Sequence, residues 1–348
     1  MQLNNMLRFK MGWADPTGTH HDVVLSSRVR LARNLNGRPF PGRAAPAVLG
    51  EVLAEVLAAA RKAKSLAKAA LIRLEDVDAV DRLFLIERHL ISRNLAAVPA
   101  GRAVLVGERE TLSTMINEED HLRLQGVDSG LCLGPLAARV SALDDELSRA
   151  LDFAVHPEWG YLAACPTNTG TGMRASCLVH LPGLALAGRI DRVLDGLSRL
   201  GVVVRGLYGE GTKVMGDFYQ VSNSTTLGPS EEATAASVTK VVGTLVHSEL
   251  EARKGLAERE RPRLEDLVYR SLGALQNSRV MSFEETVHHL SFVRLALSLG
   301  WKVPADLETV NELAVLVRPG HMQMVAGRVL EPVERDELRA ALLRRKFA

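Results

Sequence analysis

The stretch Cys165-Pro-Thr-Asn-Thr-Gly-Thr-Gly-Met-Arg-Ala-Ser176 is the most informative part of the chain. It places a cysteine, two glycines and an arginine within twelve residues of a polar segment. Arginines and carboxylates recur in three other polar motifs, Ser26-Ser-Arg28-Val-Arg30, Asn117-Glu-Glu119-Asp-His-Leu-Arg123 and Arg205-Gly-Leu-Tyr-Gly-Glu210. Such side chains in polar, glycine-containing loops predict a site for a polyphosphate and a cation.

Five arginines of these motifs form the predicted phosphate site. Guanidinium groups bind phosphate oxygens through paired hydrogen bonds, and each charge-assisted bond contributes about 1.5–3 kcal/mol. The cluster would replace a P-loop, because the chain contains no GxxxxGK[ST] sequence. All five are expected beside turns or strand ends, although any one taken singly is more typical of a surface salt bridge. They are Arg28, Arg30, Arg123, Arg174 and Arg205.

The glycines of the central stretch allow a second interpretation. Gly170-Thr-Gly-Met-Arg-Ala175 formally fits the dinucleotide fingerprint GxGxx[GA]. However, Arg174 falls inside the turn that would hold the pyrophosphate, and Cys-Pro-Thr-Asn stands where a parallel strand should end. The glycines are better explained by backbone N–H groups that approach a phosphate.

Two glutamates and one cysteine are the candidate catalytic residues. A guanidinium group keeps its proton up to a pKa above about 12, so it becomes a nucleophile only where carboxylates orient it and accept a proton. Glu119 and Glu210 suit that task, although Glu119 also fits a solvated acidic turn. Cys165 lies near Arg174, whose charge would favour a thiolate, but a buried inert cysteine remains the alternative.

The remaining cysteines and histidines carry less information. Cys132 and Cys177 have no comparable setting and are expected to be packing residues. Three cysteines at irregular spacing argue against a disulfide framework and a CxxC metal site, and no metal site is predicted. His89 is expected either to contact a nucleotide or to end a helix.

The composition limits the classes of protein. With 348 residues, 47% hydrophobic and 24% charged, the chain is typical of a folded protein of up to two domains. No apolar run approaches the roughly 20 residues that span a bilayer, and the N-terminus lacks a secretory signal, so a cytoplasmic protein is expected. A net charge of +2 gives no indication of nucleic-acid or membrane binding.

The hydrophobic pattern predicts an α+β protein with a mostly antiparallel sheet. Helices are expected at 46–69, 77–90, 137–154 and 184–200, and strands at 71–74, 103–106, 113–116, 178–181, 202–204 and 218–221. Ser230 should cap a long helix that ends near residue 259. The rest of the chain is helical in pattern, at 263–275, 282–299, 305–316 and 332–345. We therefore expect a catalytic domain at 1–255 and a helical domain at 256–348.

The ordered motifs SSRVRLARN, NEEDHLRLQ, CPTNTGTGMRAS and RGLYGEG resemble the catalytic domain of the phosphagen (guanidino) kinases. The likeness spans residues 22–254 and is closest to the bacterial protein-arginine kinases. It implies an antiparallel sheet flanked by helices, ATP and Mg²⁺ as cofactors, Glu119 as catalytic base, and Glu210 and Cys165 as positioning groups for the acceptor. Thr169 and Met173 replace aliphatic residues of the family, a departure that affects no expected contact.

The same resemblance assigns the nucleotide site to particular residues of the four motifs and to one histidine. The implied ATP-binding residues are Ser26, Ser27, Arg28, Val29, Arg30, His89, Arg123, Arg174, Ala175, Ser176, Cys177, Leu178, Arg205, Gly206, Leu207, Tyr208, Gly209 and Glu210.

Two features favour an acceptor arginine within a polypeptide. Small-molecule kinases of this family have an N-terminal helical domain of about a hundred residues, and the first motif begins here at Ser26, which leaves no room for it. The segment Arg335-Asp-Glu-Leu-Arg-Ala340 is similar to the RDxxRA motif of protein-arginine kinases, which forms an allosteric phosphoarginine pocket. By spacing alone it also fits a solvated helix end. The implied pocket residues are Arg335, Asp336, Glu337, Leu338, Arg339 and Ala340.

The sequence therefore predicts an ATP-dependent protein-arginine kinase of the stress response. The alternatives are a kinase of free arginine or another small guanidine, and a non-catalytic adaptor that reads phosphoarginine. The resemblance implies misfolded proteins, a heat-shock repressor, a zinc-binding activator and a Clp unfoldase–protease as partners, and a homodimer formed through the helical C-terminal region.

Overall fold

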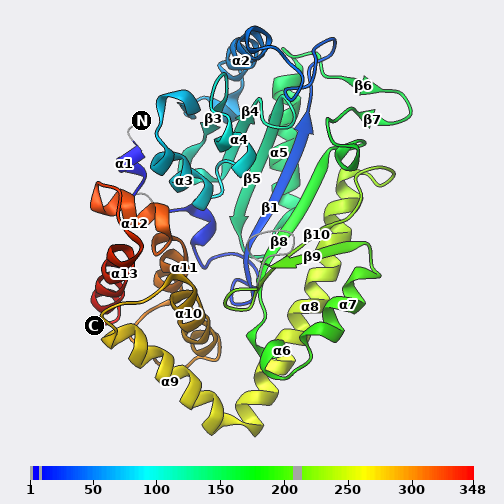
Figure 1. Cartoon of the computed structure of the whole chain (residues 1–348). Helices are drawn as coiled ribbons and strands as arrows, with labels where there is room; N and C mark the ends of the chain where they lie inside the picture. Colours follow the sequence, from blue (N-terminus) through cyan, green and yellow to red (C-terminus); the bar gives the residue numbers. More distant parts are fainter. Residues whose placement is uncertain (1–2, 8–9, 207–213) are drawn as a thin grey trace.

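The computed structural model describes residues 3–7, 10–206 and 214–348, arranged as in Figure 1. They form an eight-stranded sheet in the order β2-β3-β4-β5-β1-β8-β10-β9, in which every neighbouring pair is antiparallel. The small hairpin β6–β7 projects from the body of the protein (Figure 1). The predicted α+β class is confirmed. The strands are β1 Val24–Arg33, β2 Ala70–Arg73, β3 Ala103–Val106, β4 Leu112–Ile116, β5 Leu122–Ser129, β6 Val155–His156, β7 Gly160–Tyr161, β8 Met173–His180, β9 Val202–Gly206 and β10 Phe218–Asn223.

Helices cover one face of this sheet, and others pack on the opposite face beside β2, β3 and β4 (Figure 1). Five short 3₁₀ turns, at 12–14, 64–66, 74–76, 108–110 and 166–168, connect regular elements within the described residues. The α-helices are α1 Leu3–Met6, α2 Pro46–Ala60, α3 Ala79–Glu87, α4 Arg93–Ala97, α5 Leu133–Ser148, α6 Pro182–Leu186, α7 Ile190–Ser198, α8 Glu231–Arg259, α9 Arg261–Asn277, α10 Phe283–Ser298, α11 Leu307–Leu316, α12 Pro319–Ala326 and α13 Pro332–Lys346.

The central strand β1 separates the hydrophobic core from the site. Successive side chains of a strand point to opposite faces. Ser27, Val29 and Leu31 are fully buried, whereas the alternating Arg28 and Arg30 are only partly buried on the other face. The expectation that the arginines flank turns or strand ends was therefore wrong for these two, because they lie in the middle of β1.

The core lies between one face of the sheet and helices α5 and α8. Val140 and Leu143 of α5 and Val242 of α8 are fully buried against Val29 and Cys177 of the strands. Ser230 caps α8 as predicted, because its Oγ accepts a hydrogen bond of 3.1 Å from the Ala233 amide. This packing leaves the opposite face of the same strands free to carry polar groups.

The C-terminal helices are fastened to the start of β1. Arg294 of α10 donates hydrogen bonds to the carbonyls of His21 (2.6 Å) and Asp22 (2.8 Å). Arg253 of α8 donates to the Asp22 carbonyl (3.2 Å) and the His180 carbonyl (2.9 Å). Both guanidinium groups are almost inaccessible to solvent, so they satisfy backbone oxygens that water does not reach.

Several predicted boundaries differ from the observed ones. The helix expected at 46–69 ends at Ala60, and a 3₁₀ turn follows it. The pattern at 184–200 is divided into α6 and α7, and neither β5 nor α12 was predicted. The boundary expected near residue 255 falls within α8, one turn before that helix ends. Among the described residues, no helix combines the length and apolar character needed to cross a bilayer.

Candidate active site

Strands β5, β1, β8 and β9 carry the predicted arginines on one face of the sheet, with β10 between β8 and β9. The register pairs Arg30 of β1 with Arg174 of β8, and Ala32 of β1 with Arg123 of β5. On the far side of β8, strand β10 pairs its Gln220 with Arg205 of β9. The sheet therefore collects side chains that are far apart in the sequence into one cationic surface.

The electrostatics of this surface favour an anion. Burial, together with the charges of Arg123 and Arg174, lowers the pKa of Arg28 to about 10. Burial and the charges of Arg28, Arg123 and Arg174 also hold the pKa of Arg30 well below its ordinary value. The Arg30 Nε atom is buried without a hydrogen-bond partner among the described residues. Crowded cations with an unsatisfied donor are stabilised when a polyanion binds between them.

Two consecutive glutamates hold Arg123 in different ways. Glu118 is buried, accepts a hydrogen bond of 2.6 Å from Ser92 Oγ, and lies 2.8 Å from Arg123 Nη2. Glu119 is more exposed and lies 3.3 Å from the same nitrogen. Partial burial raises the pKa of Glu119, while Arg123 partly opposes that shift. Glu118 therefore orients the arginine, and Glu119 remains available as a proton acceptor.

A cleft of about 280 Å³ brings the candidate base, the cysteine and four of the five predicted arginines together, all but Arg28. Cys165 lies just before the 3₁₀ turn 166–168, where its Sγ atom is 3.0 Å from Thr167 Oγ1. Cys177 lies in the core and not in the cleft, and burial raises the pKa of its thiol to about 12. The cleft is lined by Arg30, Ala32, Glu119, Arg123, Cys165, Thr167, Asn168, Gly172, Arg174 and Arg205.

A buried hydrogen-bond network fixes the loops around this cleft. Asn34 Nδ2 donates to Asp120 Oδ1 at 2.7 Å, and the Ala164 amide donates to the same oxygen at 2.7 Å. The Asn34 side chain also accepts a hydrogen bond of 2.9 Å from the His121 amide. Asp120 thereby joins the loop of Glu119 to the loop of Cys165. Sequence reasoning missed this role, although both residues lie inside the quoted motifs.

The two glycines of the central stretch allow close backbone packing. Gly172 has φ of +65°, and a Cβ atom there would lie 2.6 Å from the Ala32 carbonyl oxygen. Gly170 has φ of +113°, and a Cβ atom there would lie 2.3 Å from the Thr226 carbonyl oxygen. These contacts explain the glycines by packing of the loop against β1 and residue 226, whereas the sequence suggested approach to a phosphate.

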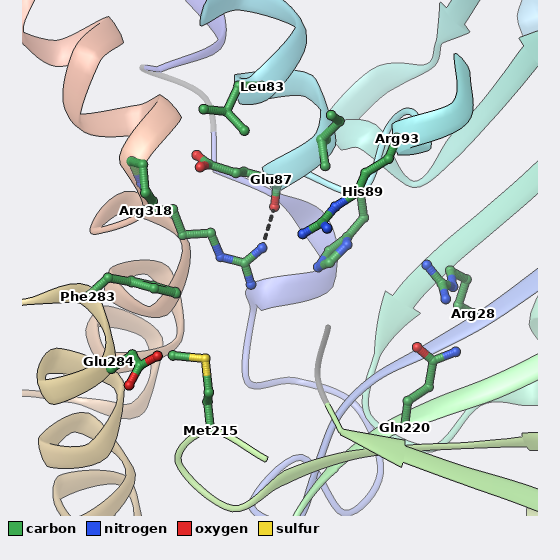
Figure 2. A pocket seen from close by; sticks show the side chains of 12 residues that line it. Arg28, Leu83, Glu87, His89, Arg93, Met215, Gln220, Phe283, Glu284 and Arg318 are labelled. Atoms are coloured by element: carbon green, nitrogen blue, oxygen red, sulfur yellow. Dashed lines mark hydrogen bonds between the residues drawn. The ribbon is translucent and has the colours of Figure 1, made fainter. Parts of the chain in front are cut away.

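A larger cavity of about 660 Å³ adjoins the cationic surface at Arg28 (Figure 2). His89 faces it just after the end of α3, in a left-handed conformation with φ of 62°. Its carbonyl accepts a hydrogen bond of 2.7 Å from Gln125 Nε2. Burial, reinforced by Arg318 and Arg28, holds the pKa of His89 well below its ordinary value and so favours the neutral form of the ring.

The other residues of the predicted nucleotide site divide between the two faces of the sheet. Ser26, Ser176 and Leu178 line a small hollow beside His89. Ser27, Val29, Ala175 and Cys177 point into the core, and Ser27 Oγ donates to the Gly130 carbonyl at 2.7 Å. Gly206 ends β9, whereas Leu207, Tyr208, Gly209 and Glu210 lie outside the described residues.

The RDxxRA segment lies on α13, where its two arginines differ. Arg335 is partly exposed, but Arg339 is 1% exposed and its guanidinium group is turned inward. Arg339 donates to the Val317 carbonyl at 2.7 Å, to the Met281 carbonyl at 2.8 Å and to the Asp336 carboxylate. Glu337 is exposed, Leu338 is partly buried and Ala340 packs in the C-terminal core.

No metal cluster is built into the described part of the chain. Residues 3–7, 10–206 and 214–348 contain no group of three or more His, Cys, Asp and Glu side chains arranged to hold an ion.

The residues that sequence reasoning missed are mostly supporting groups. Glu118, Asn34 and Asp120 are buried and hydrogen-bonded beside predicted residues, so their motif positions were the available signal. Gln220 and Arg318 line the large cavity from β10 and from the start of α12. Nothing in their local sequence indicated that position.

Comparisons with known proteins agree with this geometry. Residues 51–252 match the family model of the ATP:guanido phosphotransferase C-terminal catalytic domain, and residues 261–348 match that of the protein-arginine kinase McsB C-terminal domain. The protein-arginine kinase of Halothermothrix orenii is 42% identical over 100% of this chain and 99% of its own length. That of Bacillus subtilis is 39% identical over 96% and 93%.

Solved structures support the same fold. The duplicated taurocyamine kinase of Schistosoma mansoni gives a TM-score of 0.57 at 28% identity, covering 67% of this chain and 33% of that one. Lombricine kinase gives a TM-score of 0.58 at 24% identity, covering 71% and 70%, a likeness of fold alone. With the full-length sequence matches, these findings show that the chain belongs to the protein-arginine kinase family of ATP:guanido phosphotransferases.

Proposed function

We propose that this enzyme transfers the γ-phosphoryl group of ATP to arginine side chains of proteins. The observation that carries the proposal is the shared cleft of Glu119, Cys165 and the arginine cluster. It places a proton acceptor and a thiol opposite cations suited to a triphosphate. The full-length likeness to protein-arginine kinases supports a polypeptide as the source of the acceptor guanidinium.

The chemistry follows from the roles of these groups. Glu119 takes a proton from the acceptor guanidinium as its nitrogen attacks the γ-phosphorus, so that an N–P bond forms and the P–O bond to ADP breaks. Arg30, Arg123 and Arg174 neutralise charge on the transferred group. Cys165 and Glu210 are the proposed positioning groups of the acceptor. Mg²⁺, held through ATP, would supply further charge neutralisation between the phosphates.

The test is the chemical identity of the phosphorylated residue. The protein is incubated with ATP, Mg²⁺ and an unfolded protein, and phosphosites are mapped by mass spectrometry without acid. Phosphoarginine is expected with the wild type and is abolished in Glu119→Gln. The matched control Glu108→Gln alters an exposed glutamate outside the cleft and should retain activity. Phosphate confined to serine or tyrosine, or no phosphate at all, would reject the proposal.

Two other functions are separated by simple measurements. A small-guanidine kinase would phosphorylate free L-arginine at rates comparable to those for a protein substrate. A non-catalytic adaptor would bind phosphoarginine without consuming ATP. The cationic cleft with its candidate base favours the kinase over the adaptor, because reading phosphoarginine on α13 needs neither.

The cellular setting is part of the same proposal. The expected substrates are misfolded proteins and a heat-shock repressor, and a Clp unfoldase–protease would degrade the marked chains in the cytoplasm. The proposal also includes a zinc-binding activator protein and dimerisation through the C-terminal region. It further includes an allosteric role for Arg335, Asp336 and Arg339. The division into domains at 1–255 and 256–348 also remains a proposal, supported by the two separate family models.

A further inference from the structure

The large cavity of Figure 2 has walls from two distant parts of the chain. Arg28, His89 and Gln220 line it from the sheet side and the end of α3. Phe283 and Glu284, at the start of α10, and Arg318 and Pro319, at the start of α12, face them from the C-terminal helices. The wall that faces the sheet is thus formed by residues beyond the catalytic-domain match, which ends at residue 252.

The cavity offers apolar surface for a ring system together with polar groups that can form hydrogen bonds. Its volume of about 660 Å³ falls within the roughly 300–1,000 Å³ typical of small-molecule sites. Five of its twelve lining residues are apolar, and the other seven are polar or charged. The apolar lining residues are Leu83, Ile86, Met215, Phe283 and Pro319.

The cavity continues the phosphate cleft along β1. Arg30 lines the cleft and Arg28 lines the cavity. Residues two apart on a strand share a face and lie about 7 Å apart. A triphosphate among the cleft arginines would therefore have its nucleoside end directed past Arg28 into the cavity.

The α12 side of the wall is fixed to α3 by one buried carboxylate. Glu87 accepts hydrogen bonds from the amides of Gly320 (2.8 Å) and His321 (3.0 Å) and from His321 Nδ1 (2.8 Å). Arg318 donates to the Glu87 carbonyl at 3.0 Å, the bond drawn in Figure 2. The start of α12 is therefore held against the end of α3, the helix that leads into His89.

A single residue of α13 fixes both C-terminal parts of the wall. Arg339 donates to the carbonyl of Val317, directly before Arg318, and to that of Met281, two residues before Phe283. The guanidinium is 1% exposed, so these bonds are shielded from water. The position of both wall segments thus depends on the helix that carries the RDxxRA segment.

We propose that the C-terminal helices complete the nucleotide site, with Phe283 and Arg318 contacting the nucleobase and the ribose of ATP. The inference deepens the proposed function and rests on it for the identity of the nucleotide. It makes the C-terminal region part of the ATP site, with Arg339 as a positioning residue for its outer wall.

The test compares two ligands that share the phosphate chain. Binding of ATP and of inorganic triphosphate is measured by calorimetry on the wild type, Phe283→Ala and Arg318→Lys. Each variant should weaken ATP binding about five- to tenfold and leave triphosphate binding within about twofold of wild type. Tyr269→Ala removes an exposed aromatic ring of α9 and should change neither affinity. Thermal melting confirms that each protein is folded.

The outcomes separate this inference from the proposed function. Unchanged ATP affinity in folded Phe283→Ala and Arg318→Lys, or an equal loss of ATP and triphosphate binding, overturns the inference even if the wild type makes phosphoarginine. The expected loss of ATP binding without phosphoarginine in the wild type supports the nucleoside subsite and rejects the reaction. In steady-state assays the variants should raise KM for ATP and leave kcat nearly unchanged, because the nucleobase of ATP lies away from the phosphate that is transferred.

Discussion

Asn34 Nδ2 lies 2.7 Å from Asp120 Oδ1, a bond that joins the end of the first arginine motif to the loop that carries Glu119. The same oxygen accepts a hydrogen bond from the Ala164 amide, directly before Cys165. Asp120 is fully buried, so water cannot replace these bonds. The relative position of the candidate base and the thiol is therefore set by one carboxylate that touches neither reactant.

Replacement of Asp120 by Ala should lower kcat more than it changes the affinity for ATP. The loops of Glu119 and Cys165 would lose their common anchor, and misplacement by about 1 Å can reduce a rate on the order of a hundredfold. Loss of the buried bonds should also cost about 1–3 kcal/mol of stability. The matched control is Asp152→Ala, which removes an exposed Asn–Asp hydrogen bond to Asn36. An equal effect of both variants on kcat would contradict the anchoring role.

The acid side of the kcat profile should report Glu119. The carboxylate must be ionised to accept a proton, and burial raises its pKa above the ordinary 4.5. Activity should therefore be full above the raised pKa and fall as the pH drops through it, earlier than for an unshifted glutamate. The assay should follow ADP release, because the P–N product is labile in acid. Activity that stays constant down to the ordinary carboxyl range would exclude Glu119 as the base.

Gly320 should not tolerate a side chain. A Cβ atom there would lie 2.8 Å from Glu87 Oε2, the carboxylate oxygen that anchors the start of α12. Gly320→Ala should therefore lower the free energy of unfolding by about 1–3 kcal/mol in chemical denaturation. Gly273 of α9 has open space around its Cβ position, so Gly273→Ala should be neutral or stabilise by roughly 0.5–1 kcal/mol. Equal stability of the two variants would show that the contact relaxes freely.

Replacement of the two arginines of the RDxxRA segment should have different effects, one on ligand binding and the other on stability. Arg335 is partly exposed on α13, so Arg335→Ala should weaken binding of phosphoarginine, measured by calorimetry, with little change in melting temperature. Arg339→Ala leaves the carbonyls of Val317 and Met281 without their donor and should destabilise the protein by about 3 kcal/mol or more. If both variants melt like the wild type, Arg339 has no structural role.

The parts of the structure that could be predicted from the sequence are those encoded locally. Ser230 correctly predicted the start of α8, and the strand predicted at 103–106 has the bounds that are observed. Central strand β1 was not recognised as a strand, because the consecutive polar residues Ser26, Ser27 and Arg28 interrupt its alternation of polar and apolar side chains. Polar residues in a strand interior contradict strand propensity, which reflects packing on a half-buried surface.

In the candidate site, too, the residues that a local motif encodes could be predicted, and those that depend on distant contacts could not. The motifs supplied the arginines and Glu119, since those residue types serve the chemistry directly. The role of Asp120 depends on contacts with Asn34 and Ala164, and that of Arg318 depends on contact with Glu87, 231 residues away in the chain. Only the folded topology creates such pairs, so no local pattern could indicate them.

The alternation in β1 has an evolutionary consequence. From Ser26 to Ala32, its odd-numbered side chains, such as Val29, belong to the core, and its even-numbered ones, such as Arg28, face the site. Insertion or deletion of one residue would exchange the two sets, exposing the hydrophobic side chains and burying the charges between α5 and the sheet. Evolution can therefore substitute residues in this strand more easily than it can change the length of the strand. A lineage that gains or loses one residue there loses folding and catalysis in the same event.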